Sequence, residues 1–222
     1  MCNPMIIKEV LRYIHVPYEK ADDYIKEQVQ VAYKELENLA QIKWTYEKFP
    51  LKKEEKKIIL KGTSLEIETS DLAGVLKNSD EVYVLAATLG MQVDQRISTV
   101  QQTDMLKALL LNACANVLIE SVCDQVERNI MEDLPQSRYL TMRYSPGYGD
   151  VPLHIQPEVL KVLDTMRKIG LTTTKAGMLL PIKSVTAFIG LSSIKENRQK
   201  GCGNCLIQDV CAYRRRGEKC GS

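Results

Sequence analysis

The chain has 222 residues and a formal net charge of +2, with 45% apolar and 26% charged residues. This composition is sufficient for one domain with a sizeable core and a small appendage. The near-neutral charge gives no electrostatic case for nucleic acid or a membrane surface, and 6% aromatic residues disfavour stacking platforms for single strands. We find no secretory signal and no uninterrupted apolar run of the roughly 18 residues that cross a bilayer, so we expect a cytoplasmic protein.

The first part of the chain predicts two helices, a hairpin and a buried strand. Residues 4–15 form a short helix or an irregular entry, and residues 20–47 place apolar side chains at the spacing of an amphipathic helix. Residues 56–69 have two β-rich runs around Gly62-Thr63-Ser64, which predicts a hairpin. Residues 81–90 are rich in β-formers without strict alternation, which predicts a central strand covered on both faces.

The second part mixes long helices with further strands. The predicted elements are helices at 91–101, 103–133 and 157–170, and strands at 138–144, 171–181 and 183–193. The helix at 103–133 is apolar on more than one side, so we expect it to be buried against a sheet. Because helices and strand pairs alternate without a regular β-α-β repeat, the predicted fold class is α+β with a largely antiparallel, twisted sheet. We expect this domain to occupy residues 1–195 and a cysteine-rich tail to occupy residues 196–222.

A rigid loop follows the strand predicted at 138–144. Two glycines permit positive φ and close approach of a ligand, while Arg143 offers a planar fork for a carboxylate or phosphate. Tyr148 adds an apolar face and a hydroxyl group. Asp150 either orients Arg143 or caps a turn, and we favour the turn. The loop therefore suits a small ligand with an anionic end, although a purely structural turn with a surface arginine has the same composition.

The loop resembles the Arg-x-x-x-Gly-Tyr motif of the activation domain of cobalamin-dependent methionine synthase, which binds S-adenosylmethionine. Arg143, Gly147 and Tyr148 match that motif. A second similar stretch covers residues 170–190, where the family has a Gly, a Leu-Thr pair, a Met, a Pro and a Ser-Val pair. The resemblance is clear from about residue 138 to 190 and faint upstream.

The resemblance implies a function in repairing an oxidised corrinoid. The domain would present the methyl group of S-adenosylmethionine to the cobalamin of a separate methionine synthase or corrinoid methyltransferase, with flavodoxin or ferredoxin as the electron donor. Arg143 would hold the methionyl carboxylate, Gly147 would let the backbone approach the ligand, and Tyr148 would lie beside it. The sequence has no Asp-x-His-x-x-Gly motif for cobalt ligation, so we expect it to act on a corrinoid protein in trans.

Several positions depart from the family pattern and keep two alternatives open. Gln136 and Ser137 stand where the family has an acidic residue, and Leu180 stands where it has a tryptophan. The acidic residue that holds the ligand amino group has no clear counterpart, although Asp22 and Asp23 are available. The alternatives are a non-catalytic docking module and an iron–sulfur electron carrier for a corrinoid protein.

Four of the seven cysteines lie close together near the C-terminus, namely Cys202, Cys205, Cys211 and Cys220. In a cytosolic chain, clustered cysteines favour a metal over disulfides. Four thiolates can hold either zinc or an iron–sulfur cluster, and the C-x2-C-x5-C spacing favours the cluster. Cys114 and Cys123 lie on the long apolar helix and are predicted core residues.

Overall fold

The structure is a computed structural model that describes residues 3–195. The helices are α1 (Pro4–Tyr13), α2 (Asp23–Leu39), α3 (Asp71–Val75), α4 (Met91–Gln101), α5 (Met105–Glu132), α6 (Gln156–Leu163) and α7 (Thr165–Ile169). The strands are β1 (Lys43–Glu54), β2 (Lys57–Leu60), β3 (Glu66–Glu68), β4 (Ser79–Thr88), β5 (Tyr139–Leu140), β6 (Thr172–Thr173), β7 (Leu179–Leu180) and β8 (Ser184–Ser192). Short 3-10 turns lie at Tyr18–Lys20 and Leu153–Ile155.

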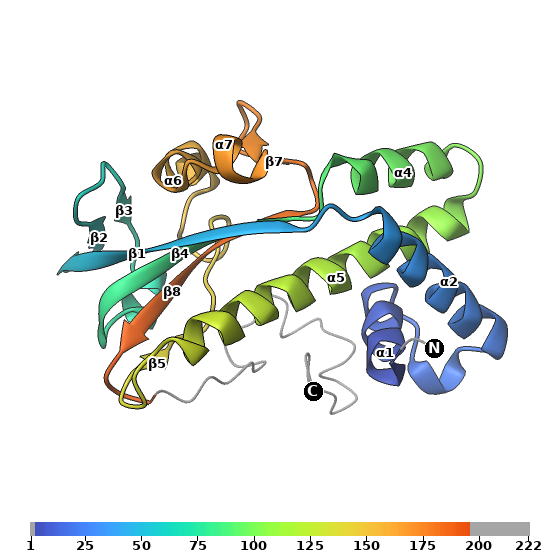
Figure 1. The fold of residues 1–222 in the computed structure, drawn as a ribbon, viewed down its shortest axis with the longest axis horizontal. Helices are drawn as coiled ribbons and strands as arrows, with labels where there is room; N and C mark the ends of the chain where they lie inside the picture. The colour runs from blue at the N-terminus through green and yellow to red at the C-terminus, as the bar shows by residue number, and fades with distance from the viewer. Residues whose placement is uncertain (1–2, 196–222) are drawn as a thin grey trace.

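Six strands form one antiparallel sheet in the order β3-β2-β1-β4-β8-β5, and β6 pairs with β7 in a separate hairpin. Figure 1 shows α6 and α7 on one face of this sheet and α5 on the other. This arrangement confirms the predicted α+β class, the antiparallel sheet and the long buried helix.

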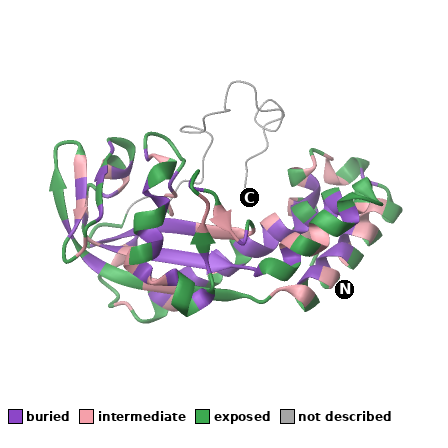
Figure 2. Ribbon diagram, turned by 90° about the horizontal axis from the view of Figure 1, so that it is seen from above, coloured by how far each residue is buried: buried purple, intermediate pink, exposed green. Residues whose placement is uncertain are grey.

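The strand β4 lies in the middle of the sheet and is covered on both faces. Leu85 and Ala87 belong to the apolar cluster shared with α1, α2, α4 and α5, whereas Val84 and Ala86 belong to the cluster shared with α6 and α7. Figure 2 shows the buried strands between more exposed helices. The lack of alternation in the sequence is thus explained, because both faces of the strand require apolar side chains.

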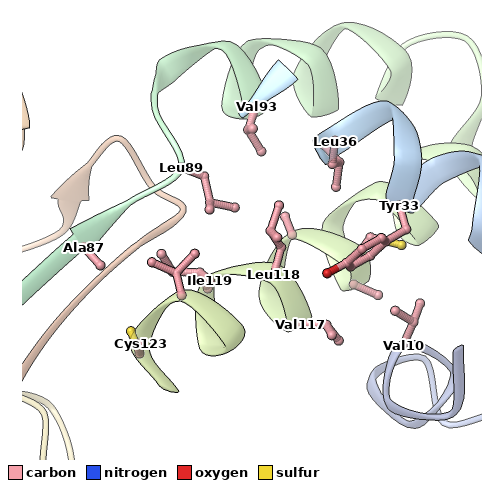
Figure 3. Packing of buried hydrophobic residues seen from close by; sticks show 14 of the residues in the cluster. Val10, Tyr33, Leu36, Ala87, Leu89, Val93, Val117, Leu118, Ile119 and Cys123 are labelled. Carbon is pink, nitrogen blue, oxygen red and sulfur yellow. The ribbon is translucent and has the colours of Figure 1, made fainter. Parts of the chain in front are cut away.

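The helix α5 is long and apolar enough to cross a membrane by length and composition, yet 56% of its most apolar window is buried within the protein. Figure 3 shows Leu118 and Ile119 of α5 packed near Leu89, which directly follows β4, with Val93 of α4 and Leu36 of α2 around them. Cys114 and Cys123 are fully buried on this helix. Both the core position of the helix and that of the two cysteines are confirmed.

Four predicted elements differ from the structure. The single strand predicted at 171–181 is instead the β6-β7 hairpin, because the chain turns back between Thr173 and Leu179. The helix predicted to reach residue 47 ends at Leu39, because residues from Lys43 onward pair with β4. The strand predicted at 138–144 pairs as a ladder only at Tyr139–Leu140, with a single further bridge at Tyr144. The helix predicted at 157–170 is interrupted at Asp164, whose φ of 53° separates α6 from α7.

Candidate functional site

The loop after β5 is fastened to the edge of the sheet by its main chain. The N–H of Tyr144 donates to the carbonyl of Phe188 at 2.9 Å, and the N–H of Phe188 donates back to Tyr144 at 2.8 Å. Gly147 then donates to the carbonyl of Val151 at 2.9 Å, which closes the loop. Gly147 and Gly149 have φ values of 91° and 52°, a region that side chains disfavour. The predicted need for glycine in this loop is therefore met at both positions.

Asp150 joins the loop to the start of α3. Its carboxylate accepts hydrogen bonds from the N–H groups of Ser70, at 2.6 Å, and Asp71, and from the hydroxyl of Thr69. Asp71 reciprocates, since its carboxylate accepts from the N–H of Asp150 at 3.1 Å. Burial works against the charge of Asp150, but these donors lower the pKa of its carboxyl. Asp150 thus caps the start of α3, which is remote in the chain, so it neither orients Arg143 nor caps a turn of its own loop as we favoured.

Arg143 projects from the loop onto α5 and meets three carboxylates. Its Nη1 donates to Glu127 at 2.6 Å and to Asp124 at 2.8 Å, and its Nη2 donates to Glu120 at 2.9 Å. The side chains of Arg143 and Glu127 are only 14% and 11% exposed, whereas those of Glu120 and Asp124 are 50% and 43% exposed. We call these four residues the Arg143 cluster. It combines one buried ion pair with two carboxylates that remain open to a ligand.

The electrostatics of the Arg143 cluster are strongly coupled. Burial disfavours the guanidinium charge, but the facing carboxylates, Glu127 first, raise the pKa of Arg143 above its ordinary value. Burial raises the pKa of the neighbouring Cys123 thiol to about 12, so this cysteine stays protonated. Burial also raises the pKa of Tyr13 at the end of α1, and the negative charge of Glu120 adds to that increase. Three carboxylates around one guanidinium give the cluster an excess of negative charge, which favours a cationic ligand group.

The sheet edge beside this loop is open. β5 pairs with β8 only at Ser192 and Leu191, and Tyr144 bridges Phe188. Within the described residues, the stretch Ser184–Ala187 therefore has β4 as its single strand neighbour. The main chain of Phe188 faces Tyr144, so that of Thr186, two residues earlier, faces the same outer side. The main chain of this stretch is therefore not used by a second strand, although Thr186 and Ala187 are buried, at 2% and 1% exposure.

The structure places the three predicted ligand residues in one loop, but with different surroundings. Arg143 forms ion pairs with carboxylates of α5, Gly147 is exposed at the loop turn, and Tyr148 is 63% exposed. Asp22 instead caps α2, since its carboxylate accepts from the N–H of Ile25 at 2.8 Å. The four cysteines predicted to bind a metal lie outside the described residues, and within residues 3–195 no group of three or more His, Cys, Asp or Glu side chains could hold a metal ion.

Sequence reasoning missed the acidic partners of Arg143. Glu120, Asp124 and Glu127 follow one another at spacings of four and three, which places them on one side of a helix. An acidic row on an otherwise apolar helix was a detectable signal, but its link to Arg143 depends on the fold. A shallow, open depression of about 510 Å³ borders the loop at Asp150, and its other lining residues are Glu54, Glu55, Lys56, Lys57, Glu68, Thr69 and Ser70.

Comparison with known families and structures identifies the class of protein. Residues 66–218 match the family model of the vitamin B12-dependent methionine synthase activation domain. This match spans more than half of the chain, and the chain therefore belongs to that family.

Among solved structures, the fold is similar to one described as the MetH reactivation domain bound to AdoHcy, with a TM-score of 0.60 and 15% identity. The similarity covers 98% of this chain and 85% of that one. At this identity the likeness concerns the fold. The comparison with curated proteins found no match.

Proposed function

We propose that this domain binds S-adenosylmethionine between the loop of Arg143, the acidic side of α5 and the open edge of β8, and presents its methyl group to the cobalamin of another protein. Family membership and the AdoHcy that is bound to the structural relative support this ligand class. The observation that carries the proposal is the Arg143 cluster, because its charges complement this ligand. S-adenosylmethionine has a sulfonium and an ammonium group beside one carboxylate.

The acidic side of α5 would receive the cationic groups of the ligand. Glu120 and Asp124 are about half exposed and lie beside the loop, so each can bind a second cation without leaving Arg143. They supply the acidic partner for the amino group that sequence comparison did not place. Because Glu127 is buried against Arg143, Glu120 and Asp124 are the carboxylates of the cluster that a ligand cation can reach.

Arg143, Gly147 and Tyr148 would hold the rest of the ligand. The three hydrogen bonds to α5 use three of the five N–H groups of a guanidinium, which leaves two for the methionyl carboxylate. Gly147 permits the ligand to approach the backbone closely, and the exposed ring of Tyr148 would lie beside it. The protein would contribute by binding and orienting the ligand, while the cobalamin supplies the metal that accepts the methyl group.

Partners and the cysteine tail complete the proposal. We infer a corrinoid protein or split methionine synthase as partner, with flavodoxin or ferredoxin as electron donor. Cys202, Cys205, Cys211 and Cys220 would hold an iron–sulfur cluster or zinc. Anaerobic purification followed by iron and zinc analysis and visible absorbance would distinguish the two, and a metal-free protein would remove this part of the proposal.

Calorimetric titration of S-adenosylmethionine tests the ligand and the cluster together. We expect saturable binding by the wild type. In Glu120→Gln the dissociation constant should rise about tenfold or more, because one charged contact is worth about 1.5–3 kcal/mol. Glu132→Gln is the matched control, since it removes the same charge about 18 Å further along α5 and should bind like the wild type. Absence of binding by the folded wild type, with and without a corrinoid partner, would favour the docking or electron-carrier alternatives.

A further inference from the structure

Lys183 lies where β8 begins and points toward α5. Its Nζ donates to the Oδ1 atoms of Asn112 and Asn116, each at 2.7 Å. Asn112 is exposed, whereas Asn116 and Lys183 are of intermediate burial. The two amides turn their oxygens toward the lysine, so their NH₂ groups remain as donors, and the ammonium has three donors of which these bonds use two. The three residues therefore form a group rich in hydrogen-bond donors.

The charge of Lys183 is not neutralised by an ion pair within residues 3–195. The charged group with the clearest influence on it is Asp94, whose carboxylate already accepts from the N–H groups of Ile182, at 2.5 Å, and Lys183, at 3.2 Å. Burial lowers the pKa of the Lys183 ammonium, and Asp94 offsets this in part. A partly desolvated cation with only amide partners retains a strong attraction for an anion.

This group adjoins the Arg143 cluster. Asn116 lies four residues before Glu120 on α5, which places the two side chains about 6 Å apart on the same side of the helix. Lys183 directly precedes the open stretch Ser184–Ala187 of β8. The same surface thus has an excess of negative charge near Arg143 and a positive charge one helical turn away, which is the pattern that orients a ligand with both signs of charge.

We propose that Lys183, Asn112 and Asn116 form an oxyanion-binding site that receives a carboxylate or phosphate group. The existence of this site follows from the donors on α5 and β8. The assignment of its anion to the ligand of the domain rests on the proposed function. Two sources have the same chemistry: the carboxylate of S-adenosylmethionine, in which case Arg143 would act by holding the acidic side chains, or a phosphate group from a separate molecule.

The test uses the full chain and three probes. Inorganic phosphate is titrated while the side-chain NH₂ signals of Asn112 and Asn116 are followed by NMR, and S-adenosylmethionine and its decarboxylated analogue are titrated by calorimetry. The variants are Lys183→Gln, Lys183→Arg, which keeps the charge, and Asn116→Asp, which keeps the lysine but gives it a carboxylate partner. Thermal melting establishes that each variant is folded.

We expect phosphate to shift both amide signals in the wild type and in Lys183→Arg. We expect it to leave both signals unchanged in Lys183→Gln, and the remaining Asn112 signal unchanged in Asn116→Asp. If the anion is the ligand carboxylate, Lys183→Gln lowers the affinity for S-adenosylmethionine about tenfold or more and leaves the affinity for the decarboxylated analogue unchanged. If it is a separate phosphate, both affinities stay unchanged while the phosphate response is lost.

The inference would be overturned if neither phosphate nor S-adenosylmethionine shifts the amide signals of the wild type. It would also be overturned if the signals of folded Lys183→Gln shift as much as those of the wild type. The phosphate titration does not require S-adenosylmethionine binding, so a failure of the proposed function is seen separately.

Discussion

The buried ion pair between Arg143 and Glu127 makes a strong prediction about stability. Replacement of Arg143 by Ala leaves the Glu127 carboxylate, which is 11% exposed, without its cation and next to two further carboxylates. Breaking a buried pair in this way costs about 3–5 kcal/mol, whereas the half-exposed pairs with Glu120 and Asp124 contribute at most about 1 kcal/mol each. We therefore expect Arg143→Ala to lower the free energy of unfolding by about 3–5 kcal/mol.

Urea denaturation at neutral pH measures this loss, and two further variants isolate its cause. The double variant Arg143→Ala, Glu127→Gln should regain a large part of the stability, because a neutral buried amide is cheaper than an unpaired charge. Arg167→Ala removes an arginine whose pair with Asp164 is exposed at 78% and 46%, and should cost about 1 kcal/mol or less. The reasoning is refuted if Arg143→Ala costs no more than Arg167→Ala, or if the double variant is no more stable than the single one.

Two further predictions concern the loop and the helix packing. Gly149→Ala should be more destabilising than Gly170→Ala: both residues have positive φ, but a Cβ at Gly149 would lie 2.1 Å from Asp71 and 2.2 Å from the Tyr144 hydroxyl, while Gly170 faces open space. Equal losses of unfolding free energy in the two variants would contradict the prediction, because they would show that the loop accommodates a Cβ at Gly149 without a clash. Glu35 is partly buried, which opposes its charge, yet its bonds to Lys107 and Arg96 lower its pKa below the ordinary 4.5. The contribution of Glu35 to stability is thus present above about pH 4.5 and is lost as pH falls further. The difference in unfolding free energy between the wild type and Glu35→Gln should therefore shrink on acidification. A difference that stays constant from pH 7 to pH 3 would contradict this.

The elements that the sequence predicted well are those with a strong local pattern. The apolar run at 81–90 and the long apolar helix appear as β4 and α5, because burial on both faces demands such composition. The errors arose where tertiary contacts override local signals. The helix predicted to reach residue 47 ends at Leu39, and Trp44 and Tyr46 instead pair with β4 as part of β1. Such pairing with a strand about forty residues away is invisible to periodicity.

The candidate site could be predicted only as a loop. The composition around Arg143 indicated a rigid turn, and the structure shows that turn with both glycines at positive φ. The partners of Arg143 lie 16, 19 and 23 residues earlier in the chain, and the sequence does not state which side of α5 faces the loop. The charge character of the surface, with its acidic cluster and adjoining lysine, therefore required the fold.

Hydrogen exchange with and without S-adenosylmethionine tests the central claim most directly, because it locates the ligand on the chain. We predict that saturating ligand slows exchange at the amide of Thr186 on the open edge of β8 and across the loop 143–149, and leaves the distant edge strand β3 unchanged. Binding that protects neither Thr186 nor the loop would place the ligand elsewhere and contradict the account.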